Sequence, residues 1–127
     1  METHSENESL IEVYHLYRGN WRTDEQANCA EDIRMRLREV ENDDSRITSD
    51  EFEDLYEKVG EEVLIEGTTG KLLNRVWKRW NATEGGIETS PAFENSHCRS
   101  LEVGDIIIIN QIKFVCKPFG WEKQPNL

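Results

Sequence analysis

The segment that decides the fold is "HCRSLEVGDIIIINQIKFVCKPFGWEKQ", residues 97–124. Ile106 to Ile109 form an apolar run without alternation, which predicts a strand buried on both faces. Asn110-Gln111 follows as a two-residue turn, and because Asn tolerates positive φ, a type I′ β-hairpin is expected. Ile112 to Lys117 is then expected to return as the antiparallel partner. The segment is therefore predicted to be a C-terminal hairpin that belongs to the core.

Two more strands are predicted upstream of this hairpin. Leu10–Tyr17, "LIEVYHLY", is rich in β-branched and aromatic residues and has apolar side chains on both faces. A second strand is expected over Val59–Glu66, with Gly60 as a β-bulge. The chain is predicted to change from helix to strand near Tyr56.

Two helices are predicted from capping residues and periodicity. Thr23 and Gln26 have capping-box spacing, and apolar residues recur at helical steps over residues 23–40. A short helical turn capped by Thr48 or Ser49 is expected before Tyr56. The clearest helix covers residues 68–82, where one apolar stripe is formed by Leu72, Leu73, Val76, Trp77 and Trp80.

Together these elements predict an α+β fold. Its sheet is expected to be small, mostly antiparallel and of three to four strands with a C-terminal β-hairpin, packed by one or two helices on one side. Residues 1–9 are predicted to be a flexible tail, residues 10–124 a single domain and residues 125–127 a second tail. The stretch "TEGGIETSPAFENS" is predicted to be a long loop, with Phe93 holding its middle to the core.

Charge is distributed unevenly along the chain. The net charge is −11, with 20 acidic and 7 basic residues up to Glu66 but 6 acidic and 8 basic residues after it. Binding of the first half to bare DNA or to an anionic membrane is therefore unlikely, since phosphate contacts need clustered Lys and Arg. The acids either form a solvated face or present a surface to a basic partner, in the extreme case as a mimic of DNA. The candidate acidic surface consists of Asp43, Asp44, Asp50, Glu51, Asp54, Glu61 and Glu62.

The helix over residues 68–82 has a basic back formed by Lys71, Arg75, Lys78 and Arg79. The plainer interpretation is a core-packing helix whose bases face solvent, or lie near the acidic half of the same chain or of a second copy, which leaves a homodimer open. The alternative is contact with nucleic acid, helped by Arg99, Lys113 and Lys117, although the overall charge opposes it.

Metal and thiol chemistry are weak alternatives. A zinc site from His97, Cys98 and Cys116 would lack the usual ligand spacing. Cys98 assisted by His15 or His97 could act as a nucleophile, but nothing in the sequence marks an activated thiolate. Cys116 is expected to be a small buried residue. No catalytic residue, metal or cofactor is therefore predicted.

The compartment is predicted from what the sequence lacks. The start "METHSENESLIEV" has no basic n-region or apolar h-region of a signal peptide, and no apolar run approaches the ~18 residues of a membrane span. The three cysteines cannot all pair, which fits a reducing compartment. A cytoplasmic protein without membrane contact is expected.

Five segments of the chain carry a resemblance to a known family: "VYHLYRG", "LYEKVGEEVLIEG", "KLLNRVWKRWN", "RSLEVGDIIII" and "KFVCKPFGWEKQ". The last two resemble the C-terminal signature of the YodL-like domains, small modules in proteins of bacteria, archaea, phages and plasmids, and the first three resemble earlier elements of these domains. The matching signature residues are Ser100, Val103, Gly104, Asp105, Gly120 and Trp121. Glu102 occupies the family's second serine position, and the helix over residues 23–40 resembles an insertion. Membership would imply an α+β fold and a mobile-element context, but no established reaction.

The predicted function is that of a non-enzymatic, acidic interaction or regulatory protein of phage or other mobile-element origin. Its expected partner is a host protein, and the alternative is a nucleic-acid-binding accessory role. The candidate binding residues are Arg99, Ser100, Asp105 and Trp121 in the C-terminal segment, with Lys71, Arg75 and Arg79 on the helix. The edge around Arg99, Ser100 and Asp105 is expected to be exposed.

Overall fold

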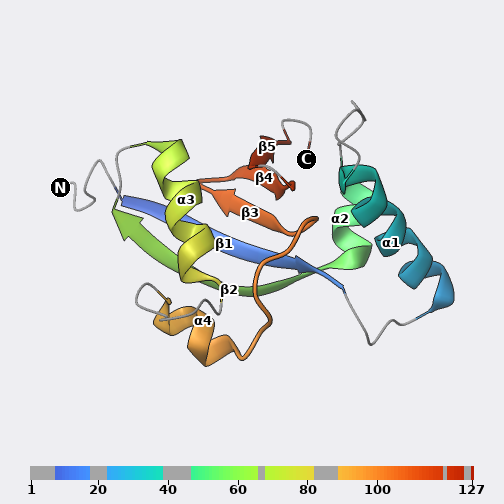
Figure 1. The fold of residues 1–127 in the computed structure, drawn as a ribbon, viewed down its shortest axis with the longest axis horizontal. Coiled ribbons are helices and arrows are strands. Elements are labelled where there is room, and N and C mark those ends of the chain that lie inside the picture. The colour runs from blue at the N-terminus through green and yellow to red at the C-terminus, as the bar shows by residue number, and fades with distance from the viewer. Residues whose placement is uncertain are drawn as a thin grey trace.

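A computed structural model describes residues 8–17, 23–38, 47–65, 68–81, 89–118, 120–124 and 127. Within them lies an antiparallel sheet of five strands in the order β2-β1-β3-β4-β5 (Figure 1). The strands are β1 (Glu8–Leu16), β2 (Tyr56–Ile65), β3 (Ile106–Ile109), β4 (Ile112–Cys116) and β5 (Trp121–Lys123). The predicted α+β class is confirmed, and the sheet contains one strand more than expected because β5 extends it beyond β4.

The predicted hairpin is β3–β4. All four isoleucines of β3 are buried, and they pair with β4 from Ile106↔Val115 to Ile109↔Ile112. Asn110 and Gln111 both have positive φ, 49° and 75°, as a type I′ turn requires. The turn also joins β1, because the Leu10 N–H donates to Asn110 Oδ1 (2.9 Å) and the Asn110 N–H donates to the Leu10 carbonyl (3.1 Å). β3 therefore lies between β1 and β4 as the central strand of the sheet.

Helices cover both faces of the sheet, where one covered side was expected. They are α1 (Asp24–Arg38), α2 (Ser49–Leu55), α3 (Thr69–Arg79) and α4 (Pro91–Ser96). Alternate residues of β3 enter two cores: Ile107 and Ile109 pack with α3 and α4, while Ile106 and Ile108 pack with α1 and α2. In Figure 1, α3 crosses the sheet, and α1 and α2 gather at the end where β1 finishes and β2 begins. An apolar strand with two buried faces requires this second layer.

Helix caps follow the predicted pattern. The Gln26 N–H donates to Thr23 Oγ1 at the start of α1, and Thr48 forms a complete capping box with Glu51 at the start of α2. α2 ends at Leu55 and β2 begins at Tyr56, so the predicted change of structure is confirmed and the strand starts three residues before Val59. Residues 39 and 40 of the predicted first helix lie outside the described residues.

The bulge predicted near Gly60 is confirmed by the register of β1 and β2. Val13 pairs with Gly60 but Tyr14 pairs with Lys58, so the register shifts at this point. A Cβ atom on Gly60 would lie 2.6 Å from the Trp80 ring. Glycine is therefore needed here for the indole of α3 to pack directly on the strand.

Three boundaries differ from the predictions. Glu8 and Ser9, expected in the tail, belong to β1, and Leu127 is half-buried and packs against the core beneath α1 and α2. Part of the predicted loop is α4, which Ser90 caps and Pro91 starts. Phe93 holds α4 to the core as expected, with its ring 5.9 Å from that of Trp80. Among the described residues no helix is long and apolar enough to cross a membrane.

Candidate functional site

The predicted exposed edge around Asp105 is wrong, because this carboxylate is fully buried. Its oxygens accept hydrogen bonds from the Leu16 N–H (2.9 Å) and the Glu102 N–H (2.8 Å). The Arg99 guanidinium adds a bidentate ion pair, with distances of 2.7 Å from Nη1 to Oδ2 and 2.9 Å from Nη2 to Oδ1. A buried carboxylate is tolerated when charge and hydrogen bonds satisfy it in this way. Asp105 therefore joins the segment before β3 to the end of β1.

Arg99 and its neighbours complete this junction. The Arg99 guanidinium also donates to the carbonyls of Leu16 and Ser100. From the other face, Arg34 of α1 donates to the Leu16 carbonyl, and the Tyr56 hydroxyl donates to the Gly104 carbonyl (2.6 Å). The polar groups of Arg99 and Asp105 are thus engaged inside the chain. We name this arrangement the Asp105 junction: Asp105, Arg99, Leu16, Glu102 and His15.

His15 belongs to the junction as a buried, uncharged group. Its Nε2 lies 4.0 Å from Asp105 Oδ2 and makes no hydrogen bond to any described residue. Burial is the largest influence and lowers the pKa of His15, although the Asp105 carboxylate opposes it. Cys98 Sγ accepts a hydrogen bond from Ser96 Oγ, and no hydrogen bond in the described part of the chain joins it to His15 or His97. The described residues therefore do not pair the Cys98 thiol with a histidine base.

The cysteines also fail to form a metal site among the described residues. No group of three or more His, Cys, Asp or Glu side chains there is arranged to hold a metal ion. Cys116 is buried in β4, as predicted, and burial raises the pKa of its thiol to about 12. Cys29 is exposed on α1.

The candidate acidic residues do not share one surface. Asp50 and Asp54 are exposed on α2, whereas Glu51 closes the helix cap and pairs with Arg36 (3.2 Å). On β2, Glu61 pairs with Lys58, and Glu62 lies on the opposite face of the strand. Asp43 and Asp44 lie outside the described residues. Several of these acids are thus neutralised where they lie.

Glu62 has an internal structural role. It accepts hydrogen bonds from Arg79 (2.8 and 3.0 Å), from Trp80 Nε1 (2.8 Å) and from Ser90 Oγ (2.8 Å). Burial alone would raise the pKa of Glu62, but these three donors lower it below its usual value. The carboxylate therefore connects β2 to α3 and to the residue that caps α4.

The structure divides the basic back of α3. Arg79 is paired with Glu62, and Arg75 donates to the Ile65 carbonyl, so both lie along β2. The expected contact with an acid of the same chain is therefore found for Arg79, whereas Arg75 meets a backbone carbonyl. Lys71 and Lys78 remain exposed and lie about two turns apart on the same face of the helix.

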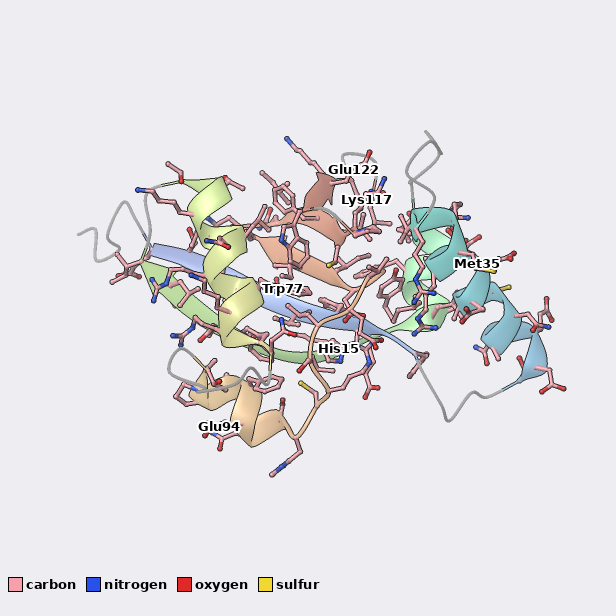
Figure 2. The ribbon with its side chains drawn as sticks, viewed as in Figure 1. His15, Met35, Trp77, Glu94, Lys117 and Glu122 are labelled. Atoms are coloured by element: carbon pink, nitrogen blue, oxygen red, sulfur yellow. The ribbon has the colours of Figure 1, made fainter. Side chains whose placement is uncertain are left out.

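A groove separates α3 from the β4–β5 corner, with a volume of about 490 Å³. Its aromatic wall consists of Trp77 and Trp121, which pack edge to face with their ring centres 6.4 Å apart and their planes at 76°. Figure 2 shows Trp77 on α3, and Lys117 beside Glu122 near β5. The lining residues are Gly70, Leu73, Asn74, Trp77, Cys116, Lys117, Pro118, Gly120 and Trp121. We call this the Trp77–Trp121 groove.

The groove has a different charge from the chain as a whole. None of its described lining residues is acidic, and the one charged member, Lys117, pairs with Glu122 at 3.2 Å. Lys71 and Lys78 flank the helical stripe formed by Gly70, Asn74 and Trp77. An apolar hollow with a few polar groups at its rim is the usual form of a binding site.

Sequence reasoning identified Trp121 and missed Trp77. Trp77 was assigned to the core stripe of α3, but 39% of its surface is exposed, whereas Trp80 is completely buried. The missed signal is a second stripe at helical spacing, Gly70, Asn74 and Trp77, which combines a large aromatic ring with residues that leave space beside it. Gly120 and Trp121 of the predicted signature therefore line the same groove as Trp77.

A second hollow, of about 260 Å³, lies between α1 and α2. Its lining includes the carboxylates of Glu25, Asp50, Glu51 and Asp54 together with Cys29. A cluster of acids alone gives no specific chemistry, so the Trp77–Trp121 groove is the candidate site.

Comparison with protein-family models, curated proteins and solved structures finds no match to this chain. The resemblance to YodL-like domains therefore stays a prediction, and the function must be argued from the groove itself.

Proposed function

We propose that this protein is a non-enzymatic interaction module that binds a partner protein through the Trp77–Trp121 groove. One observation carries the proposal: two tryptophans from elements far apart in sequence pack edge to face, and both are only partly buried where they line a single hollow. The same helix buries Trp80 completely. The fold thus has room for an indole in its core, and it leaves these two beside solvent.

Tryptophan at such a position has a large energetic effect on association. Trp is among the residues most enriched at the energetic centres of protein interfaces, because it removes much apolar surface from water and loses little conformational entropy. Truncation of such a residue commonly costs ~2 kcal/mol or more of binding free energy. A groove with two of them has the composition of a binding surface.

A binding role without catalysis is supported by the state of the reactive side chains. Cys116 lines the groove, but burial keeps its thiol protonated. His15 and Asp105 are buried in the junction and do not line the groove. The chemistry available in the groove consists of aromatic faces, the Asn74 amide and the Lys117 ammonium.

The resemblance to YodL-like domains supplies the biological setting of the proposal. Gly120 and Trp121, which match the closing part of that signature, both line the groove. A protein from a phage or another mobile element would use this surface on a host protein inside the cell. We do not extend the proposal to DNA mimicry, because the described acids lie on separate elements and are partly paired.

The proposal can be tested by selecting from a library of random 12-residue peptides displayed on phage. The wild-type protein should enrich a family of peptides that share a large apolar residue. Gly70→Leu should abolish their binding, because a Cβ atom on Gly70 meets nothing within 4 Å and the added side chain would extend into the groove. Leu also has a higher helix propensity than Gly, so the fold should be preserved.

Thr69→Leu is the matched control, since it adds the same side chain one residue away from the lining. The selected peptides should bind this variant as they bind the wild type. Peptides that bind Gly70→Leu and the wild type equally would refute the groove as the site.

A further inference from the structure

We infer that the segment bound by the groove is a short peptide with one large apolar side chain flanked by acidic residues. The inference rests on the proposed function and adds the chemistry of the ligand. It follows from three properties of the Trp77–Trp121 groove: its size, the apolar character of its walls and the charge of its rim.

The size and walls fit a side chain attached to a short backbone. A volume of about 490 Å³ is within the range of ~300–1,000 Å³ found for small-ligand pockets. Leu73, Pro118 and the two indoles provide apolar contact, and the Asn74 side chain is exposed where a peptide group could hydrogen-bond to it. An apolar or aromatic side chain placed in the groove against this aromatic surface would remove its own apolar surface from water.

The rim determines the charge of the flanks. Lys71 and Lys78 are exposed beside the lining stripe of α3, and Lys123 is exposed on β5 on the other side. Glu122 neutralises Lys117, and no described lining residue is acidic. In a chain with a net charge of −11, this basic rim selects acidic flanks by charge complementarity.

A peptide fits these observations better than a nucleic acid does. The indole planes meet at 76°, so they do not form the parallel walls that would sandwich a base. A polyanion would also carry many phosphates into the field of an acidic chain, whereas a short peptide places a few carboxylates beside three lysines.

The experiment measures fluorescence anisotropy of three fluorescein-labelled, nine-residue peptides with the full chain. Each peptide has one central Trp, and its flanks are Asp and Glu, Ser and Gly, or Lys. The acidic peptide should bind most tightly and the Lys peptide least. Lys78→Glu should lower the affinity for the acidic peptide by about fivefold or more, because a favourable contact becomes a repulsion.

Arg38→Glu is the matched control, since Arg38 is likewise an exposed base in the last turn of a helix, and its helix α1 packs in the core that does not contain α3. It should leave the affinity within about twofold of the wild type. Affinity for the acidic peptide should also fall as salt is raised from 50 to 500 mM.

Each other outcome overturns the inference in a distinguishable way. If the three peptides bind equally and Lys78→Glu has no effect, while Gly70→Leu still abolishes binding, the acidic flanks are refuted and the proposed function stands. Failure of all three peptides, alongside a successful selection from the random library, refutes the ligand class alone. Tighter binding of a single-stranded oligonucleotide of nine thymidines than of the acidic peptide would assign the groove to nucleic acid.

Discussion

The two ends of the segment from Arg99 to Lys123 differ in structural role: one stabilises the interior, and the other lines a groove. At the first end, Asp105 and Arg99 are charged residues that satisfy each other and the end of β1 inside the protein. At the second end, Gly120 and Trp121 leave a groove open beside α3. Both ends were predicted to contribute to binding, and only the second lines an open groove.

The difference shows that charge in a sequence is a poor guide to exposure when a long-range partner exists. Leu16 and Asp105 are 89 residues apart, yet they form one hydrogen bond in the interior. Trp77 shows the converse, since an aromatic residue expected in the core stripe of α3 lies at the accessible wall of the groove. Substitutions should therefore separate stability from binding.

The largest effect on stability is expected for Asp105→Ala. Removal of the carboxylate leaves the Arg99 guanidinium and two backbone N–H groups without their partner in a buried site. Breaking a buried ion pair costs about 3–5 kcal/mol, and urea denaturation should show this loss in the free energy of unfolding. Glu53→Ala, at an exposed position of α2, should change that free energy by less than about 0.5 kcal/mol. A loss for Asp105→Ala no greater than that of this control would contradict the junction.

Glu62→Gln should cost less, about 2 kcal/mol. The amide keeps the shape but loses the charge, so the hydrogen bonds from Arg79, Trp80 and Ser90 are weakened or lost. Chemical denaturation gives the measurement, and Glu61→Gln on the exposed face of the same strand is the control. Equal effects of the two substitutions would show that Glu62 has no special role.

A smaller effect, limited to a range of pH, is expected from His15. Its pKa in the folded protein lies below the unfolded value of about 6.5, so the unfolded chain binds the proton first. The free energy of unfolding should be steady above about pH 6.5 and decline as the pH falls from there toward the folded pKa. His15→Gln should flatten this decline when unfolding is followed from pH 7.5 to 5. An unchanged decline in the variant would exclude His15 as its source.

The smallest effects on the free energy of unfolding are expected for two glycines of the groove, and they have opposite signs. Gly70→Ala should raise the free energy of unfolding by at most about 1 kcal/mol, because alanine favours the helix and its Cβ enters open space. Gly120→Ala should instead lower it, since Gly120 has φ of 86°. Thermal denaturation of the two variants measures both signs. A destabilising Gly70→Ala would mean that the groove wall is packed.

Local structure in this chain could be predicted where neighbouring residues determine it. The isoleucine run, the Asn110-Gln111 turn and the Thr23 and Thr48 caps each depend on contacts within a few residues, and the structure contains all of them. The prediction of a long loop was wrong in part, because Ser90 caps and Pro91 starts a short helix. The Phe93 ring of this helix packs against the ring of Trp80, which lies outside the predicted loop.

Of the two tryptophans in the candidate site, Trp121 could be predicted from the sequence and Trp77 could not, for a geometrical reason. A helical stripe indicates which residues lie together but does not give the width of the surface that covers them. On α3, Leu72, Val76 and Trp80 fill the contact with the sheet, and Trp77 falls beside it. Its counterpart Trp121 stands on β5, a strand of three residues after a glycine turn, which is too short for a periodic signal. The groove exists only once these two elements are assembled.

The most direct test of the groove follows the indole N–H signals of the tryptophans in two-dimensional ¹⁵N–¹H NMR spectra during titration with the acidic nine-residue peptide. We expect the signals of Trp77 and Trp121 to shift, while that of Trp80, whose Nε1 donates to Glu62 in the interior, stays in place. Binding that leaves the Trp77 and Trp121 signals unchanged and shifts amides of α1 and α2 instead would contradict it.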